Sequence, residues 1–402
     1  MKLHKILIDA VLLSLDEIFF QERYADKVIE KVLKSNPKWG ARDRAFIAEN
    51  VYEIVRNWRL LSYVTDSTSR EQDRLEQITA AWFYHKGYEA NEWSGFKRLN
   101  YERLEMLFEQ AGANRALIES VPNWLDKLCF EEIGEKWGDE LHAMNQPANV
   151  VIRTNTLKTD RQTLKSALEA ENILTDTLED TPDALVLKER KNLFTTALFK
   201  QGHFEIQDAG SQWIAPMLDV KPGMRVIDAC AGAGGKTLHL SALMNNKGSL
   251  IAMDTEAFKL DELKKRARRA GVGNVETREI ESTKTIKRLY ETADRVLLDV
   301  PCSGLGVLRR NPDAKWKLSE SFIQKIQITQ RDILSRYSKM IRGNGKLVYA
   351  TCSLLPSESE DQVKWFLEDQ AGAFELIEER RCSPVLHGYD GFYMACLQKV
   401  GA

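Results

Sequence analysis

Two cysteines follow apolar stretches that are expected to be strands, and this pairing is the clearest chemical signal in the sequence. Cys302 comes directly after Asp299-Val-Pro, and Cys352 follows Lys346-Leu-Val-Tyr-Ala-Thr. In an open α/β sheet, ligands bind outside the carboxyl ends of the strands, so both thiols and the Asp299 carboxylate are expected to face one pocket. A single cysteine is more often a small buried hydrophobe. Two at equivalent strand ends, where loops commonly carry function, indicate a site that uses thiol chemistry.

The remaining cysteines keep the simpler interpretation of buried side chains. They are Cys129, Cys230, Cys382 and Cys396. The six cysteines contain no C-x-x-C pair and no regular spacing, so neither a zinc site nor a disulfide framework is indicated. We therefore expect no metal and reduced thiols, as is usual in a cytoplasmic protein.

A glycine-rich turn after another apolar stretch is the best candidate for a ligand-binding loop. Residues 225–237 read Arg-Val-Ile-Asp-Ala-Cys-Ala-Gly-Ala-Gly-Gly-Lys-Thr. Gly232, Gly234 and Gly235 let backbone amides approach a ligand closely, because glycine takes conformations that other residues avoid. The segment that begins at Thr237 is expected to be a helix whose N-terminus points at that ligand.

The spacing of these glycines separates the nucleotide-binding motifs that compete for the loop. A phosphate-binding P-loop needs glycine at position 230, where cysteine stands, and the dinucleotide fingerprint needs a small residue in place of Thr237. An ordinary strand-to-helix turn would also explain three glycines alone. The next apolar stretch, however, ends in Asp254, and an acid at that place can hold two ribose hydroxyls. What remains is a nucleoside site without a pyrophosphate, and S-adenosylmethionine is such a ligand.

Length and composition describe a globular protein of more than one domain. The chain has 402 residues, of which 43% are hydrophobic and 29% charged, and this length predicts two or three domains. No apolar run approaches the ~20 residues that span a bilayer. The first residues resemble a signal peptide, but Asp9 interrupts the apolar run, which favours an amphipathic helix. We expect a cytoplasmic monomer without a membrane partner.

The net charge of -2 gives no global attraction for nucleic acid, so such a partner would have to meet a local basic surface. Residues 259–269 are one basic group, which fits an ordinary solvated helix face. A second group is the better candidate for phosphate contacts, because it has Trp316 within it and follows Cys302 closely. Its members are Arg309, Arg310, Lys315 and Lys317.

Residues 1–145 are expected to form an all-helical domain. The clearest helix is predicted over 41–64, where apolar residues recur every three or four positions and so share one face. That stripe consists of Ile47, Val51, Ile54, Trp58 and Leu61. Further helices are predicted near 4–20, 24–34, 72–88, 98–111 and 121–144.

The pattern changes class at Pro147. Residues 146–220 mix short strands with a helix, which predicts a small α+β subdomain. In residues 221–402, strands and helices alternate, and that order calls for a mostly parallel sheet covered on both faces. Two last strands, near 374–378 and 392–398, have no helix between them and are expected to be an antiparallel edge pair.

These motifs together resemble one family. Asp299-Val-Pro-Cys302-Ser-Gly and Thr351-Cys352-Ser353, beside the glycine loop, are similar to the RNA cytosine-C5 methyltransferases of the RsmB/Nop2/Sun type. The resemblance covers roughly residues 145–400 and includes Gln207-Asp208, Ser211-Gln212 and the segment from Arg309 to Trp316. The helical region resembles, through residues 43–64, the NusB-like RNA-binding bundle that often precedes this catalytic domain. DNA cytosine methyltransferases are less similar, because they lack the second Thr-Cys strand.

The resemblance implies a fold, a cofactor and a reaction. The fold is a class I, Rossmann-like S-adenosylmethionine methyltransferase sheet, and the product is 5-methylcytidine. The implied catalytic residues are Cys352 as the nucleophile for cytosine C6, Cys302 for product release, and Asp299 with Lys236 at the cytosine edge. The implied cofactor-binding residues are Ala229, Cys230, Ala231, Gly232, Ala233, Gly234, Gly235, Lys236, Asp254, Glu281 and Asp299. Ala233 stands where the family loop usually has proline, which bears on the rigidity of the loop and not on the ligand.

Ribosomal RNA of the 16S type is the expected substrate, with an unstacked cytosine as the target. Transfer RNA stays open as an alternative substrate. A noncatalytic RNA-binding relative is a second alternative, although the intact residues Cys352, Cys302, Asp299 and Lys236 argue against it. A nucleotide-hydrolysing P-loop protein is a third, and it would need glycine at position 230.

Overall fold

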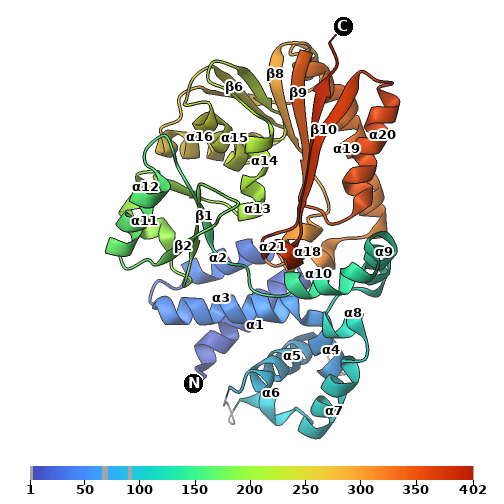
Figure 1. Ribbon diagram of the computed structural model, residues 1–402. Helices are drawn as coiled ribbons and strands as arrows, with labels where there is room; N and C mark the ends of the chain where they lie inside the picture. Colours follow the sequence, from blue (N-terminus) through green and yellow to red (C-terminus); the bar gives the residue numbers. More distant parts are fainter. Residues whose placement is uncertain (1–2, 66–70, 89–92, 402) are drawn as a thin grey trace. The chain divides into compact units, whose positions relative to one another are not determined.

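The computed structural model describes residues 3–65, 71–88 and 93–401, and it divides the chain into two compact units (Figure 1). The first unit comprises Met1–Gln146 and Leu308–Glu320, and the second comprises Pro147–Val307 and Ser321–Ala402. The chain therefore passes between the units after Gln146, after Val307 and after Glu320. The segment Leu308–Glu320, which we call the excursion, interrupts the second unit in sequence and belongs to the first.

The described residues of the first unit form helices and turns. The helices are α1 (Lys5–Phe19), α2 (Ala25–Ser35), α3 (Ala41–Arg56), α4 (Trp58–Thr65), α5 (Glu71–His85), α6 (Ser94–Lys97), α7 (Tyr101–Ala111), α8 (Arg115–Ile118), α9 (Asn123–Ile133), η1 (Gly134–Lys136), α10 (Trp137–Met144) and α18 (Ala314–Lys317). The predicted stripe faces their common core, because Ile47, Val51 and Ile54 are fully buried there. The helical class expected for this region is confirmed.

Two helices predicted as continuous are each interrupted. The predicted helix 41–64 breaks at Asn57, because the amides of Arg59 and Leu60 donate to the hydroxyl of Ser120 at 2.9 and 3.3 Å. The predicted helix 121–144 breaks at Gly134, whose φ of 77° lies in the left-handed region. Both predictions were wrong at these points. The spacing of hydrophobic residues predicts a helix, but it does not depend on a hydroxyl far away in the chain or on the backbone angle of one glycine.

The excursion Leu308–Glu320 packs its basic residues inside the helical unit. Lys315 is 1% exposed and donates from Nζ to the carbonyl of Arg56 at 2.8 Å. Arg309 is 7% exposed and donates to the carbonyl of Ala143 at 2.9 Å. The prediction that this group contacts phosphates is therefore wrong for both residues, because their donors are bonded to carbonyls away from solvent.

A small antiparallel sheet opens the second unit, in the order β2-β3-β1-β4. Its elements are β1 (Val151–Thr154), α11 (Arg161–Ala170), β2 (Thr175–Thr177), β3 (Ala184–Leu187), η2 (Leu193–Thr195), α12 (Ala197–Lys200) and β4 (Phe204–Ile206). Ile152, Leu185 and Phe204 form its buried core with α11. The α+β character expected here is confirmed, and β2 is an additional strand too short for alternation to reveal.

The large sheet has seven strands in the order β10-β11-β9-β8-β5-β6-β7. The strands from β9 to β7 are parallel, whereas β11 is antiparallel to both β9 and β10. The elements are α13 (Ala209–Gln212), α14 (Ile214–Met217), β5 (Arg225–Asp228), α15 (Gly235–Leu243), β6 (Ser249–Asp254), α16 (Ala257–Ala270), β7 (Val275–Glu279), α17 (Thr283–Lys287), β8 (Ala293–Asp299), η3 (Leu305–Val307), α19 (Glu320–Tyr337), η4 (Ser338–Met340), β9 (Ile341–Thr351), η5 (Pro356–Glu358), α20 (Glu360–Asp369), β10 (Phe374–Cys382), α21 (Pro384–His387) and β11 (Phe392–Lys399). The parallel sheet with an antiparallel edge is confirmed.

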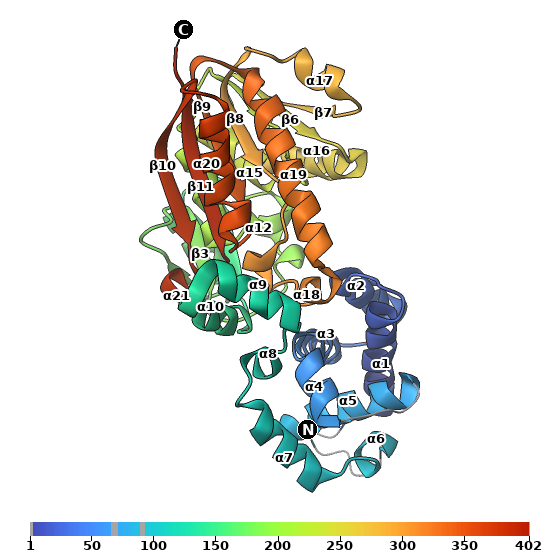
Figure 2. The ribbon, with the colours of Figure 1, turned by 90° about the vertical axis from the view of Figure 1, so that its right-hand side faces the viewer.

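Helices cover both faces of this sheet, α15 and α16 on one and α19 and α20 on the other (Figure 2). Neighbouring residues of β5 point to opposite faces, so Val226 packs against α15 while Ile227 packs against α19. No helix in the described part of the chain combines the length and the apolar character that crossing a bilayer requires.

Lys315 yields a prediction about pH. Burial, with the nearby Arg56 charge, lowers the pKa of Lys315 to about 7, whereas an unfolded lysine titrates near ~10.4. Between these pH values the unfolded chain binds more protons, so the free energy of unfolding rises with pH. We expect Lys315→Met to lose part of that rise. Thermal denaturation at pH 6.5 and pH 9 should show wild type gaining on the variant at the higher pH. An equal difference between the two proteins at both pH values would contradict the prediction.

Candidate functional site

The glycine-rich turn between β5 and α15 has a backbone that glycine adopts easily. Gly232 has a φ of 52° and Gly234 a φ of 89°, both in the left-handed region. A Cβ atom on Gly234 would lie 2.5 Å from Cγ of Leu263, so a larger residue would displace α16. The amide of Gly234 donates to the carbonyl of Ala231 at 2.9 Å. The turn is therefore closed immediately before α15 begins.

Asp254, the last residue of β6, holds this turn from the side. Its Oδ2 accepts a hydrogen bond from the amide of Gly232 at 2.9 Å, and its Oδ1 accepts one from the amide of Glu256 at 3.0 Å. The residue is 9% exposed. Each carboxylate oxygen can accept a second hydrogen bond. Asp254 can therefore support the loop and bind a pair of ligand hydroxyls at the same time.

A hollow of ≈ 230 Å³ opens beside the turn, at the carboxyl end of β8. Its lining consists of Gln207, Ser211, Asp228, Cys230, Ala231, Gly232, Ala233, Gly235, Lys236 and Asp299. The other predicted cofactor residues lie next to this lining without belonging to it. Ala229 donates from its amide to the carbonyl of Leu297 at 3.0 Å, and the exposed Glu281 follows Ile280, whose amide donates to the carbonyl of Asp254 at 2.9 Å.

Asp228 lines the hollow, but our interpretation of the sequence assigned it no role. Burial raises its pKa to about 7, although the hydroxyl of Thr237 donates to its Oδ2 at 2.7 Å. Its buried Oδ1 has no hydrogen-bond partner among the described residues. The available signal was its place, since Asp228 ends β5 as Asp254 ends β6.

Lys236 and Asp299 form an ion pair at the edge of the hollow, with 2.5 Å between Nζ and Oδ2. Lys236 comes from the first turn of α15, and Asp299 is the last residue of β8. Burial opposes the charged ammonium, but the Asp299 carboxylate outweighs it and raises the pKa of Lys236 above its ordinary value. Lys236 therefore stays charged, and the pair can offer a donor and an acceptor side by side.

The two predicted thiols meet at the ends of β8 and β9. The Sγ atoms of Cys302 and Cys352 are 3.3 Å apart. Strand register brings them together, because Asp299 pairs with Ala350 and each cysteine follows a few residues later. The hydrogen bond to Cys352 and burial both raise the pKa of Cys302 well above the ordinary range. Cys302 thus keeps its proton at neutral pH.

The loops that carry the two thiols share one hydrogen-bonded frame. The amide of Gly306 donates to the carbonyl of Cys352 at 2.9 Å, and the hydroxyls of Ser303 and Ser353 lie 3.1 Å apart. Glu358 is fully buried and accepts from the amide of Ser303 at 2.7 Å. Burial raises the pKa of this carboxyl group. The positions of the two thiols are therefore set jointly.

The small antiparallel sheet also reaches the glycine turn. Arg266 of α16 donates to the carbonyl of Ala233 at 2.8 Å and pairs with Glu205 of β4 at 3.0 Å. Arg269 pairs with the same carboxylate at 2.6 Å, and Glu205 is 3% exposed. Our sequence interpretation missed this support, because no local pattern connects three residues from such distant segments.

Comparison with known proteins agrees with this architecture. Residues 215–398 match the family model described as 16S rRNA methyltransferase RsmB/F. Residues 121–193 match the model of the ferredoxin-like domain of RsmF/B-like methyltransferases. The first match contains the glycine turn, Asp254, Asp299 and both thiols, and the second contains β1, β2 and β3.

A curated relative covers nearly the whole chain. The probable ribosomal RNA small subunit methyltransferase B of Synechocystis sp. is 30% identical over 437 residues, which cover 96% of this chain and 98% of that protein. Among solved structures, that of PH0851 has a TM-score of 0.85 at 24% identity and covers 99% of this chain and 100% of its own. A methyltransferase homolog protein from Pyrococcus horikoshii has a TM-score of 0.64 at 28% identity and covers 71% and 98%. The chain therefore belongs to the RsmB/Nop2/Sun family of S-adenosylmethionine-dependent methyltransferases.

Proposed function

We propose that this protein methylates C5 of a cytosine in ribosomal RNA of the small subunit, through a covalent bond between Cys352 and C6 of the base. One observation carries the proposal: two thiols 3.3 Å apart lie at adjacent strand ends, near the Lys236–Asp299 ion pair. The choice of RNA is supported by the relatives, whose names specify ribosomal RNA of the small subunit.

The first step makes C5 nucleophilic. C5 of cytosine reacts poorly with a methyl donor, so the Cys352 thiolate adds to C6 and the electron pair of the C5–C6 double bond moves toward C4 and N3. Asp299 and Lys236 bind the N3 and N4 edge of the base, where charge changes during this addition. C5 then has enamine character and can accept the methyl group that S-adenosylmethionine, held by the residues of the hollow, would supply.

Release needs a base that removes the C5 proton, and Cys302 fits that role. In the resting site, the hydrogen bond to Cys352, burial, and the charge that Cys352 carries as the proposed thiolate nucleophile hold the pKa of Cys302 high. Once Cys352 is bonded to carbon, that anion is gone and Cys302 ionises more readily. Loss of the C5 proton restores the C5–C6 double bond and expels Cys352 as a thiolate.

The residues of the hollow fit S-adenosylmethionine, which supplies the methyl group. Asp254 binds the ribose, and the backbone of residues 229–235 binds the methionine part. The unpaired, buried Oδ1 of Asp228 is suited to a charged ammonium group of that part. We place the adenine near Glu281, which lies in the loop after β7.

We further propose that residues 1–145 are a NusB-like RNA-binding domain, that 146–220 are a small subdomain leading into the catalytic part, and that 221–402 are the methyltransferase domain. The buried basic residues Arg309 and Lys315 contribute no phosphate contacts in this proposal. A transfer RNA substrate or a noncatalytic RNA-binding role are the alternatives to be tested.

The reaction can be tested with labelled S-adenosylmethionine and unmodified small-subunit ribosomal RNA. We expect wild type to form 5-methylcytidine, and Cys352→Ser to form none, because a hydroxyl is a far weaker nucleophile than a thiolate. Cys302→Ser should accumulate a protein–RNA adduct that survives denaturation, because the C5 proton is removed slowly. Nucleoside mass spectrometry and denaturing gels measure both outcomes.

The Cys129→Ser variant serves as the matched control, since its buried thiol belongs to the other compact unit of the chain. Product formation by Cys352→Ser would disprove the nucleophile assignment. Label in transfer RNA alone would replace the substrate, and RNA binding without any transfer would favour the noncatalytic alternative.

Cofactor binding gives a separate prediction. Asp254→Asn keeps the size of the side chain but removes its charge and puts an NH₂ donor at one of its two acceptor positions, where the amide of Gly232 or Glu256 donates. We expect S-adenosylmethionine to bind at least about tenfold more weakly, because the ribose contacts and the loop support are lost together. Calorimetric titration measures this. Asp261→Asn, on the exposed face of α16 and paired with Lys264, is the control and should bind like wild type; equal affinity of both variants would refute the role of Asp254.

A further inference from the structure

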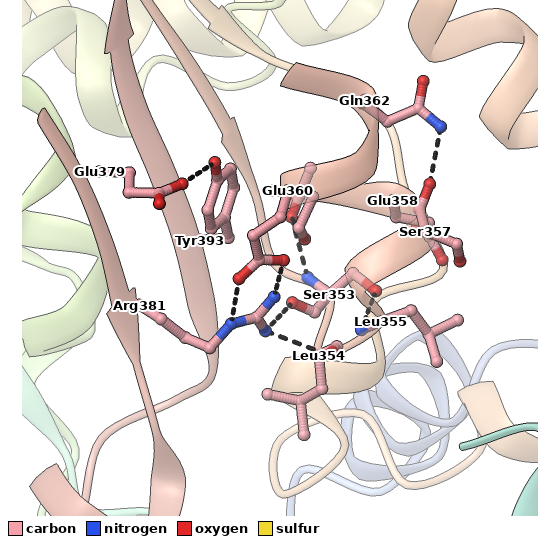
Figure 3. Close-up of polar contacts among 12 residues, drawn as sticks. Ser353, Leu354, Leu355, Ser357, Glu358, Glu360, Gln362, Glu379, Arg381 and Tyr393 are labelled. Atoms are coloured by element: carbon pink, nitrogen blue, oxygen red, sulfur yellow. Dashed lines mark hydrogen bonds and ion pairs between the residues drawn. The ribbon is translucent and has the colours of Figure 1, made fainter. Parts of the chain in front are cut away.

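The backbone carbonyls of Cys352, Ser353 and Leu354 all accept hydrogen bonds. Gly306 donates to the first, that of Cys352, at 2.9 Å. Arg381 donates from Nη1 to the other two, that of Ser353 at 3.5 Å and that of Leu354 at 3.0 Å (Figure 3). Ser353 is fully buried and Leu354 is 4% exposed. Solvent therefore has little access around Ser353 and Leu354, and the guanidinium group of Arg381 is the donor that satisfies their two carbonyls.

Arg381 is itself fixed in direction. Its Nε and Nη2 both donate to the carboxylate of Glu360 at the start of α20, at 2.9 and 2.5 Å. Its guanidinium carbon lies 5.6 Å from the ring centre of Tyr393, the residue opposite it in the β10–β11 pair. Tyr393 donates in turn to Glu379, two residues before Arg381 on the same face of β10 (Figure 3). The guanidinium group thus points from the edge of the sheet toward the loop that follows Cys352 in the chain.

This arrangement requires arginine. A guanidinium group presents donors in a fixed plane, so it can bind a carboxylate with two groups while a third reaches the carbonyls. A lysine ammonium is a single point with no such plane, and glutamine has too few donors. Removal of the donor would leave two buried carbonyls unsatisfied, and the loop would then relax away from its present course.

We propose that Arg381, oriented by Glu360, is a positioning residue that fixes the backbone of residues 353 and 354 and thereby the direction of the preceding Cys352 thiol toward its target carbon. The inference rests on the proposed covalent role of Cys352. It gives the antiparallel edge strand β10 a task in the reaction, although no residue of β10 lines the hollow beside the glycine turn. Misplacement of a reacting atom by about 1 Å can cost about a hundredfold in rate.

The test measures the Cys352 thiol in two reactions. One is single-turnover adduct formation with RNA that contains 5-fluorocytosine, where C5 cannot lose a proton and the adduct is trapped. The other is alkylation of Cys352 by iodoacetamide, followed by peptide mass spectrometry, in which a small reagent needs no fixed thiol direction. The variants are Arg381→Ala, Arg381→Lys and Glu360→Gln. Arg380→Ala is the matched control, because that side chain points to the other face and stacks on Trp213.

We expect Arg381→Ala and Arg381→Lys to form the RNA adduct about ten- to one-hundredfold more slowly than wild type, and Glu360→Gln to lie between. Cys352 alkylation, S-adenosylmethionine affinity and the melting temperature should stay close to wild type for Glu360→Gln and Arg381→Lys. Arg380→Ala should form the adduct at the wild-type rate.

Three results would overturn the inference. The first is adduct formation at the wild-type rate in all three variants. The second is a parallel loss of adduct formation and alkylation in Arg381→Lys, which would mean that the acidity or exposure of the thiol had changed. The third is an equal loss in Arg380→Ala, which would indicate a general effect of the strand. If wild type itself forms no adduct, the proposed function fails, and that result is distinct from all three.

Discussion

The register between β8 and β9 is the constraint on which the site depends. Asp299 lies opposite Ala350, and this pairing carries Cys302 and Cys352 to a sulfur–sulfur distance of 3.3 Å. Side chains alternate between the faces of a sheet, so a slip by one residue would send every core side chain of a strand to the wrong face. Leu297 and Val348 are fully buried on one face, as Leu298 and Tyr349 are on the other. The packing of the whole sheet therefore holds the two thiols in place.

Burial around these strand ends makes the site an arrangement of competing charges. The ion pair of Lys236 with Asp299 keeps one ammonium charged, while burial raises the pKa of Asp228 to about 7 and that of Glu358 above its usual range. Charges interact strongly where water is scarce. A change of charge on the Cys352 sulfur is consequently felt by the neighbouring Cys302 thiol, and the proposed reaction, in which one thiol acts after the other, uses this coupling.

The features that could be predicted from the sequence are those that produce a pattern among residues close together in the chain. Alternating strands and helices from residue 225 onward gave the sheet, and the carboxyl ends of its strands located Asp254, Asp299 and both thiols. Features set by distant contacts were missed or mistaken. The break at Asn57 depends on the hydroxyl of Ser120, more than sixty positions away in the chain. The burial of Lys315, predicted to contact phosphates, depends on a carbonyl of α3. The sequence shows that a residue is charged, but it does not show which partner will bind that residue away from solvent.

In the glycine turn, contacts with distant segments take the place of a residue that would stiffen the loop locally. Ala233 stands where the family loop usually has proline, and the sequence alone therefore left the rigidity of the turn without a source. Arg266 supplies one, because it donates to the carbonyl of Ala233 while Glu205 holds its guanidinium group from β4. Proline restrains a loop by fixing one backbone angle. A buried ion pair instead restrains it through two other segments, and only the folded chain brings these together. The small antiparallel sheet thereby supports the glycine turn through Glu205 of β4.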